Sequence, residues 1–370
     1  MIPGPEEVYG ALDSRFPFDS AYDWDNSGWQ VVATRPIQRC LVVLDPSVAA
    51  IEKAIQWGAQ LVVTHHPLYM PSTSSIHPAS KTGAITKVLL VSETGMLSSH
   101  SCADRNINGI SGALADLLKL ENQEVLAPDE QGTFFKLVTF VPDEHLEVVR
   151  TGLSAAGAGV IGNYEECSFS LAGTGTYRPQ SGARPMQGEI GRLEEVDEYR
   201  LEMRVPASAI GRVLKALRRY HPYDEVAFDL YRTFAQGDDL GIGVIGSLPQ
   251  PKKVDELTAQ IKEVLGGVPL SVTGPDEGEI EVVAVAGGSA ADLVPVAASR
   301  SAQLFVGGDL KYHKLLEYSD TLVCLDPGHR ASEQPGVERL ADVLRHAAVR
   351  NHWDLEVETF LEDPAMGRII

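Results

Sequence analysis

Cysteine is scarce in this sequence. Four residues, Cys40, Cys102, Cys167 and Cys324, are spread over 370 positions, and no two of them form a CxxC pair. Such spacing is typical of reduced thiols in a core rather than of a disulfide framework. The sequence also lacks an apolar run of about eighteen residues, which a membrane span needs, and its acidic N-terminus is unlike a signal peptide. These absences predict a cytoplasmic protein with no membrane partner.

Positive charge is scarce as well. The chain has 31 lysines and arginines against 51 aspartates and glutamates, which gives a formal net charge of −20. Binding to an extended nucleic acid or to an anionic membrane requires a broad basic surface. The composition therefore excludes both as general partners, while a local basic pocket for a small phosphorylated ligand remains compatible with it. A P-loop and a dinucleotide-binding loop after an apolar strand are also lacking.

The pattern of apolar runs divides the chain into three parts. Residues 1–130 alternate short apolar runs such as Arg39–Leu44 with helical patterns such as Ser47–Trp57, which predicts a parallel sheet with helices on its faces. Residues 131–236 follow the order β-α-β-β-α-β, which is the ferredoxin-like plan. Residues 237–370 resume the first pattern. We therefore predict an α/β fold with a discontinuous core that is interrupted by an inserted α+β domain.

Two motifs with histidines follow the ends of predicted strands. His65 and His66 come directly after the apolar run Leu61–Val63, and neighbouring loop histidines can point to two different metal ions. His329 and Glu333 are four residues apart, so a helical turn would place both on one face, where they suit joint metal coordination. Each motif also has a simpler interpretation. His65 and His66 could be a chance pair of histidines in a loop, and His329 and Glu333 could be a pair on the surface of a helix.

Two more motifs add histidines and carboxylates after strands. His100 and Asp104 form one; alternatively, His100 is a buried core histidine and Asp104 caps the next helix. Asp309 and His313 form the other, with Asp309 as the N-cap of a following helix as the alternative. Together the four motifs hold five of the ten histidines and three carboxylates. This concentration predicts a metal site with histidine and carboxylate ligands and no thiolate, of the catalytic or exchangeable kind.

Two other polar segments allow more than one interpretation. Asp25 and Asn26 either bind a ligand or form an Asx-turn before the next strand, and the local pattern favours the turn. His221–Glu225 lies between the last helix and the last strand of the insert. A rigid connection with a charged rim is the favoured interpretation of this segment, with ligand binding as the alternative.

The sequence resembles the NGG-interacting factor three (NIF-three) family, also called GTP cyclohydrolase 1 type 2 homologues, over nearly the whole chain. Residues 131–236 are similar to the insertion of its long bacterial members, which resembles CutA and PII-like domains. The chain departs from the family pattern at Ser101–Ala103, where Thr-Asn-Leu is usual, so the resemblance says less about the substrate than about the metal. Five motifs in the same order carry the resemblance: Trp24–Gln30, Thr64–Leu68, His100–Asp104, Gly307–His313 and Gly328–Glu333.

The resemblance implies a centre of two divalent metal ions (Zn, Fe or Mn), with Glu333 as the bridging carboxylate. His100 and His313 would transfer protons, and Asp25, Asn26 and Asp309 would line the pocket. The family also forms homo-oligomers, often ring-like hexamers with the metal sites facing an internal cavity. The implied metal ligands are His65, His66, Asp104, His329 and Glu333.

Two functions from different classes are compatible with these features. The first is a metal-dependent hydrolase acting on a nucleotide-like small molecule. In it, water activated by the metals would open the imidazole ring of guanine, and a second water would release formate; alternatively, activated water would cleave a phosphoester. The second is a non-enzymatic metal-binding regulator or oligomeric scaffold, which the CutA/PII-like insert suggests. Because imidazole binds metal only when neutral, metal occupancy is expected to fall below about pH 6.

Overall fold

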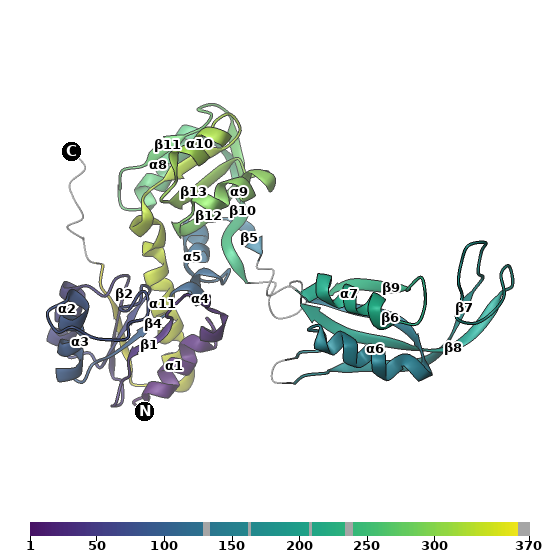
Figure 1. The fold of residues 1–370 in the computed structure, drawn as a ribbon. Coiled ribbons are helices and arrows are strands. Elements are labelled where there is room, and N and C mark those ends of the chain that lie inside the picture. Colours follow the sequence, from purple (N-terminus) through teal and green to yellow (C-terminus); the bar gives the residue numbers. More distant parts are fainter. Residues whose placement is uncertain (129–133, 162–163, 207–208, 234–239, 362–370) are drawn as a thin grey trace. The chain divides into compact units, whose positions relative to one another are not determined.

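The protein consists of two compact units (Figure 1). The computed structural model describes residues 1–128, 134–161, 164–206, 209–233 and 240–361. Unit 1 comprises Met1–Ala127 and Asp239–Ile370, and unit 2 comprises Pro128–Asp238. The predicted domain boundaries, after residues 130 and 236, lie outside the described residues. None of the described helices is long and apolar enough to cross a membrane.

Unit 1 is formed from both halves of the chain and contains two sheets, which the pattern of apolar runs does not distinguish. The first sheet has the strand order β1-β4-β3-β2-β15, and all neighbours run parallel except β1 and β4. Its last strand comes from the C-terminal end of the chain and pairs with β2. The strands are β1 (Gly28–Val31), β2 (Arg39–Val43), β3 (Leu61–Thr64), β4 (Gly95–Ser98) and β15 (Glu356–Thr359).

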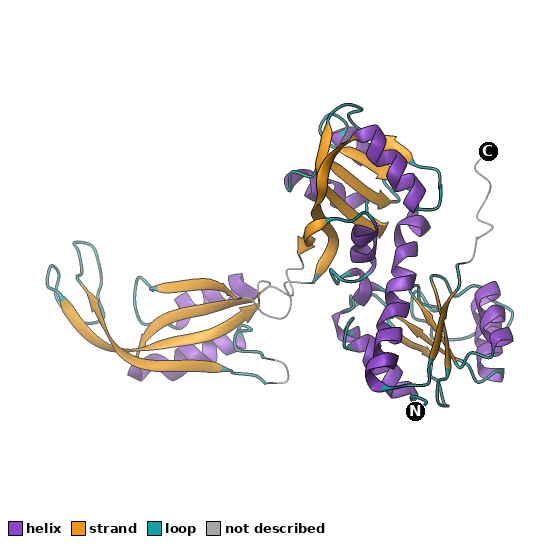
Figure 2. Ribbon diagram, turned by 180° about the vertical axis from the view of Figure 1, so that it is seen from behind, coloured by secondary structure: helices purple, strands orange, loops and turns teal. Residues whose placement is uncertain are grey.

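Helices cover both faces of the first sheet because its strands are apolar on both sides. Leu41 and Val43 pack against α2 (Val48–Trp57) and α3 (Lys81–Val91), whereas Val42 packs on the opposite face. That opposite face is covered by α1 (Pro5–Asp13) and by the long helix α11 (His329–Asn351), as Figure 2 shows. A parallel sheet covered in this way leaves its carboxyl ends open for a site.

The second sheet has the order β11-β14-β13-β12-β10-β5. Its three central strands β12, β13 and β14 are parallel, while β10 and β11 pair antiparallel with their neighbours. The strands are β5 (Glu121–Pro128), β10 (Gly241–Lys253), β11 (Ser271–Thr273), β12 (Glu279–Ser289), β13 (Leu304–Gly308) and β14 (Val323–Asp326). The remaining helical segments of unit 1 are η1 (Phe18–Ser20), α4 (Ser101–Asp104), α5 (Ile110–Leu117), α8 (Val254–Val264), η3 (Ala291–Leu293), α9 (Val294–Ser299) and α10 (Tyr312–Tyr318).

Helix α11 connects the two sheets of unit 1 (Figure 1). It begins directly after β14, contacts β12 and β13 of the second sheet, and then runs to β2 and β15 of the first. Leu340 and Leu344 on this helix are fully buried in the core that also contains the first sheet. The first turn of α11 is therefore held at the carboxyl ends of strands from both sheets.

Unit 2 has the element order β-α-β-β-α-β that the sequence predicts for the insert. Its sheet has the order β7-β8-β6-β9, and all neighbouring strands are antiparallel. Both helices pack on one face of this sheet around Leu137, Leu153 and Leu217. The elements are β6 (Phe134–Pro142), α6 (Asp143–Ala155), β7 (Ser168–Tyr177), β8 (Glu194–Pro206), α7 (Ile210–Tyr220) and β9 (Phe228–Thr233).

Candidate metal centre

The histidines of the four motifs are placed in unit 1 by the ends of strands. His65 and His66 follow β3, and their N–H groups donate to the carbonyls of Val43 and Leu44, so the pairing with the neighbouring chain segment continues past the strand. His100 follows β4 after Ser99, and it precedes the short helix α4. On the second sheet, Asp309 follows β13 and His329 begins α11 after β14. All four motifs lie where the sequence predicts them.

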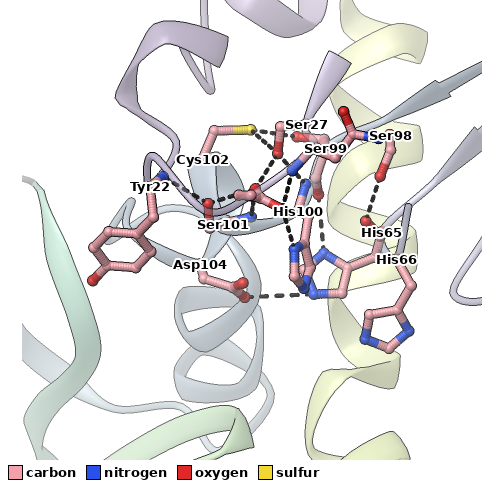
Figure 3. Close-up of polar contacts among 12 residues, drawn as sticks. Tyr22, Ser27, His65, His66, Ser98, Ser99, His100, Ser101, Cys102 and Asp104 are labelled. Atoms are coloured by element: carbon pink, nitrogen blue, oxygen red, sulfur yellow. Dashed lines mark hydrogen bonds and ion pairs between the residues drawn. The ribbon is translucent and has the colours of Figure 1, made fainter. Parts of the chain in front are cut away.

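Glu333 lies at the centre of the cluster, and only 4% of its surface is exposed. Its Oε1 is 3.2 Å from His329 Nε2 and 3.7 Å from His65 Nε2. Its Oε2 is 3.1 Å from His66 Nε2. On the other side of His65, Asp104 Oδ1 is 3.5 Å from the same Nε2, and Figure 3 shows this contact beside the ring of His100. The structure thus brings the five predicted ligands together.

Every histidine in the cluster has its Nδ1 bound to an oxygen. The backbone carbonyl of Ser99 can only accept, so His65 must donate to it from Nδ1, which leaves Nε2 directed toward Glu333. Carboxylates hold the other three rings in the same way, which fixes the tautomer that a metal requires. The four Nδ1 contacts are His65 to Ser99 O at 2.9 Å, His66 to Asp45 Oδ1 at 2.8 Å, His100 to Asp25 Oδ1 at 2.7 Å and His329 to Asp309 Oδ2 at 2.7 Å.

The donor atoms fit a divalent metal ion. His65 Nε2 and Glu333 Oε2 are buried and have no hydrogen-bond partner within the described chain. Ligand atoms bound tetrahedrally to one ion at about 2.0–2.2 Å lie roughly 3.4 Å apart, which is close to the spacing seen here. Three groups of ligand atoms lie within 4.8 Å of one another: His65–His66–His100, His66–His329–Glu333 and His65–Asp104–Glu333. Two of these groups share Glu333.

The metal-free cluster depends on protons for its positive charge. Burial raises the pKa of Glu333, but the three facing imidazoles outweigh this effect and leave the pKa far below its ordinary value. Glu333 in turn raises the pKa of His329 to about 9. Burial lowers the pKa of His66, but Asp45 and Glu333 raise it to about 10. Burial also raises the pKa of Asp104. A bound cation would take the place of these protons.

Asp25 is the partner of His100, and the contacts of its side chain are not those of an Asx-turn. Its Oδ1 accepts from the N–H of the adjacent residue Asn26 at 2.7 Å, whereas an Asx-turn uses the N–H two residues on, and it also accepts from His100 Nδ1. Its Oδ2 accepts from the hydroxyls of Ser27 at 2.6 Å and Ser101 at 2.5 Å. Burial raises the pKa of Asp25, but these hydrogen bonds outweigh it and lower the pKa well below the ordinary range. Asp25 therefore stays ionised and holds His100 in place.

Two predicted residues, Asn26 and His313, have other positions than the sequence suggested, and one alternative interpretation, that of Asp309, is wrong. Asn26 donates to the carbonyl of Tyr69 at 2.8 Å, so it supports a loop, and among the described residues its side chain forms no hydrogen bond with the imidazoles. His313 is exposed on α10 and belongs to none of the ligand groups found among the described residues. The alternative role of Asp309 as a helix N-cap is wrong, because α10 begins at Tyr312 and Asp309 bonds His329 instead.

Sequence reasoning missed Asp45 and Gly288. Asp45 follows an apolar strand and precedes a proline, which is the same pattern that singled out His65 and His66. Gly288 has a positive φ of 71°, and a Cβ at this position would lie 2.3 Å from Glu333 Oε1. In the sequence, the pair Gly287-Gly288 predicts a turn, but it does not indicate that a carboxylate packs against that turn.

The cluster opens to a cleft within unit 1. The cleft has a volume of about 2460 Å³, and its lining includes Asp45, His66, Asp309, His329 and Arg330. His65 and Glu333 lie deeper, with 0% and 4% of their surfaces exposed. A small molecule in the cleft would therefore reach the imidazoles of His66 and His329 first.

Comparisons with known proteins identify relatives over nearly the whole chain. A family model described as Duf34/NIF3 (NGG1p interacting factor 3) matches residues 5–364. A Halalkalibacterium halodurans protein named GTP cyclohydrolase 1 type 2 homolog is 36% identical over 349 residues, which cover 93% of this chain and 94% of that protein. A Bacillus subtilis protein of the same name is 33% identical over 338 residues, covering 90% of this chain and 91% of that protein.

Solved structures match over the full length as well. A Bacillus cereus protein related to NIF3 covers 100% of both chains with a TM-score of 0.68 and 32% identity. A Staphylococcus aureus protein covers 100% of both chains with a TM-score of 0.70 and 24% identity, which supports the fold alone. The resemblance of the motifs is confirmed, and the chain belongs to the Duf34/NIF3 (NGG1p interacting factor 3) family.

Proposed function

We propose that the protein is a metal-dependent hydrolase that acts on a nucleotide-like small molecule. The observation that carries this proposal is the position of Glu333. It is buried, shared by two ligand groups, and faced by imidazoles whose Nδ1 atoms are all fixed. A cleft large enough for a nucleotide opens beside two of these imidazoles. Preorganised ligands next to an accessible cleft are typical of catalytic rather than structural metal sites.

Two divalent ions, Zn, Fe or Mn, are the proposed occupants. His66, His329 and Glu333 would hold one, and His65, Asp104 and Glu333 would hold the other, so that Glu333 is the shared carboxylate. When bound, such ions polarise a substrate bond and make water acidic enough to supply a nucleophile near neutral pH. The histidine and carboxylate donors, with no thiolate among them, suit exchangeable ions of this type.

His100 is the residue that we propose to move protons. Its Nδ1 is held by the ionised Asp25, which leaves Nε2 directed toward the other imidazoles. The centroid of its ring is 5.1 Å from that of His65 and 5.6 Å from that of His66. An imidazole oriented by a carboxylate in this way can take a proton from water or return one to a leaving group. His313 is far less suited to this role, because it is exposed on α10.

Activity measurements test the proposal directly. The full-length protein is loaded with Mn²⁺, Fe²⁺ or Zn²⁺ and assayed with GTP and other nucleotides for release of formate and of phosphate. The expected result is metal-dependent turnover of at least one nucleotide. Glu333→Gln should abolish turnover, whereas Glu52→Gln, at an exposed position on α2 that does not line the cleft, should leave it unchanged. No hydrolysis of any nucleotide by any metal-loaded form would contradict the proposal.

The same variants address the rival function. If the metals serve to assemble a scaffold, Glu333→Gln should dissociate the particle, and neither form should hydrolyse nucleotides. We also propose a homo-oligomer, with a hexamer as the form that the family resemblance implies, and light scattering after size exclusion measures it. The CutA/PII-like character of unit 2 is likewise a proposal, supported by its element order and by the strand order β7-β8-β6-β9.

A further inference from the structure

Unit 2 contains a cavity of its own, separate from the cleft in unit 1. Its volume is about 860 Å³, and its wall is formed by β7, the loop that follows it, and the segment before β9. Cavities that bind small molecules commonly measure about 300–1,000 Å³ and combine aromatic walls with a few polar groups. All residues that line this cavity belong to unit 2, so any ligand bound there would be independent of the metal ligands.

Two tyrosine rings line the cavity in fixed positions. The ring centroids of Tyr177 and Tyr223 are 6.3 Å apart. The hydroxyl of Tyr177 donates to the carbonyl of Gln187 at 2.9 Å. Tyr223 is fixed from behind by His221, whose Nδ1 accepts from the Tyr223 N–H at 3.2 Å. Because the two ring planes are inclined by 57°, a flat ligand can stack on one ring while the other ring contacts its edge.

His221 has a structural role in this arrangement. It is buried, and its Nε2 donates to the carbonyl of Phe140 at 2.9 Å while Nδ1 accepts from Tyr223. Both ring nitrogens are therefore used. This agrees with the interpretation of His221–Glu225 as a rigid connection, and it means that Tyr223 rather than His221 is available to a ligand. Tyr223 lines the cavity, whereas His221 does not.

Glu198 is placed to accept a hydrogen bond from a ligand. Its Oε1 accepts from the Tyr223 hydroxyl at 2.7 Å, and in the described chain its Oε2 has no hydrogen-bond partner. A glycine on the neighbouring strand makes space for it. A Cβ on Gly175 would lie 2.1 Å from Glu198 Oε2, so a glycine at this position admits the carboxylate.

We propose that this cavity binds a flat nitrogen heterocycle with N–H donors, of the purine-base type. One tyrosine ring would stack against the heterocycle and the other would contact its edge, and Glu198 Oε2 would accept one of its N–H groups. Charge favours a base or nucleoside over a nucleotide with several phosphates. Glu198, Asp224 and Glu225 line the cavity, and of the two arginines that also line it, Arg200 is already paired with Glu202 at 2.8 Å.

Calorimetric titration of the full-length protein tests this site. Guanosine is the probe because its base carries N–H donors, and caffeine is the matched probe because it has the purine ring without any N–H. Guanosine should bind the unmodified protein at least tenfold more tightly than caffeine. Glu198→Gln should weaken guanosine binding at least tenfold and leave caffeine unchanged. Glu195→Gln, an exposed carboxylate on the same strand that does not line the cavity, should change neither.

Two further variants separate the outcomes. Glu333→Gln in unit 1 should leave guanosine binding unchanged, so that failure of the proposed hydrolase and failure of this site are distinguishable. Tyr177→Leu should weaken guanosine and caffeine together, which covers the case in which Glu198→Gln does not fold. The proposal is overturned if guanosine does not bind at millimolar concentration. It is also overturned if Glu198→Gln and Tyr177→Leu bind like the unmodified protein, or if Glu333→Gln abolishes binding.

Discussion

Arg330 Nη1 donates to Asp45 Oδ2 at 2.8 Å, although 285 residues separate the two in the chain. The other oxygen of Asp45 accepts from His66 Nδ1 at 2.8 Å. Asp45 therefore joins the first turn of α11 to an imidazole from the first sheet. Partners of this kind set the orientation of a metal-facing ring, and their loss typically weakens metal binding about 10–100-fold.

The first prediction concerns this carboxylate. Asp45→Ala should weaken zinc binding by about 10–100-fold, because the ring of His66 loses the group that fixes its tautomer. Competition with a chromophoric chelator measures the change. Asp342→Ala serves as the control, since Asp342 is an exposed residue of α11 that pairs only with Arg345 among the described contacts. Equal affinity in the two variants would show that Asp45 does not orient His66.

The second prediction concerns ligands from opposite ends of the chain. His65→Ala and His329→Ala should each remove bound metal, because both rings present Nε2 to Glu333. His145→Ala in unit 2 and His352→Asn at the end of α11 should retain it, and asparagine suits the positive φ of 53° at residue 352. Elemental analysis of the four purified variants decides the matter. Full metal content in both of the first two variants would mean that the site is wrong.

The sequence predicts the site better than it predicts the architecture around it. His329 and Glu333 could be paired because helical spacing is local, and the structure places both on the first turns of α11. Asp45 has the same sequence context as His65, because it too lies between an apolar strand and a proline. It has no neighbouring histidine, however, and so the sequence did not indicate a metal site there. Local patterns therefore identify donors, whereas the partners that orient them depend on tertiary contacts.

The division of unit 1 into two sheets could not be read from the sequence for a different reason. Hydrophobic periodicity identifies strands but says nothing about which sheet each one joins. Strand β15 shows the difficulty, because Glu356–Thr359 alternates charged residues at an exposed edge and pairs with β2 from the far end of the chain.

The third prediction is a pH dependence of the metal-free protein. The pKa of His66 is raised to about 10 and that of His329 to about 9, above the ordinary value of 6.5. A raised folded-state pKa adds stability that is complete below pH 6.5 and is lost as the pH rises through 9 and 10. The free energy of unfolding of the metal-free protein should therefore fall between these limits.

Metal should remove this dependence, because bound imidazoles are already neutral. Chemical denaturation at a series of pH values, with and without zinc, measures both curves. The same shifts mean that protons compete with metal at higher pH than the value of about 6 expected for unperturbed histidines. A metal-free protein whose stability is flat from pH 6.5 to 10 would contradict the raised pKa values.

The fourth prediction concerns the glycine beside Glu333. Gly288→Ala should weaken metal binding, because the new Cβ would lie 2.3 Å from Glu333 Oε1 and must displace it. Gly267→Ala is a matched control: its φ of 78° is close to the 71° of Gly288, but a Cβ there meets no atom within 4 Å. Both variants should lose about 1 kcal/mol of stability from backbone strain. Only Gly288→Ala should lose metal affinity, and equal affinities would rule out the contact.

The fifth prediction concerns the removal of unit 2. Strands β5 and β10 are neighbours in the second sheet, and contacts at both ends show that they run in opposite directions. Asn122 Nδ2 donates to Ser247 Oγ at 3.1 Å, and a Cβ on Gly243 would lie 3.1 Å from Leu126 Cδ2. The end of β5 therefore lies beside the start of β10. A short Asn-Gly turn can join antiparallel strands in such an arrangement.

A chain in which this turn replaces residues 129–238 should keep its metal, because all five predicted ligands belong to unit 1. Its metal content and its affinity for zinc should equal those of the full-length protein, while the binding of guanosine should be lost together with the cavity of unit 2. Elemental analysis and calorimetry on the same preparation measure both properties. A folded variant without metal would show that the centre depends on unit 2, and a variant that still binds guanosine would place that ligand in unit 1.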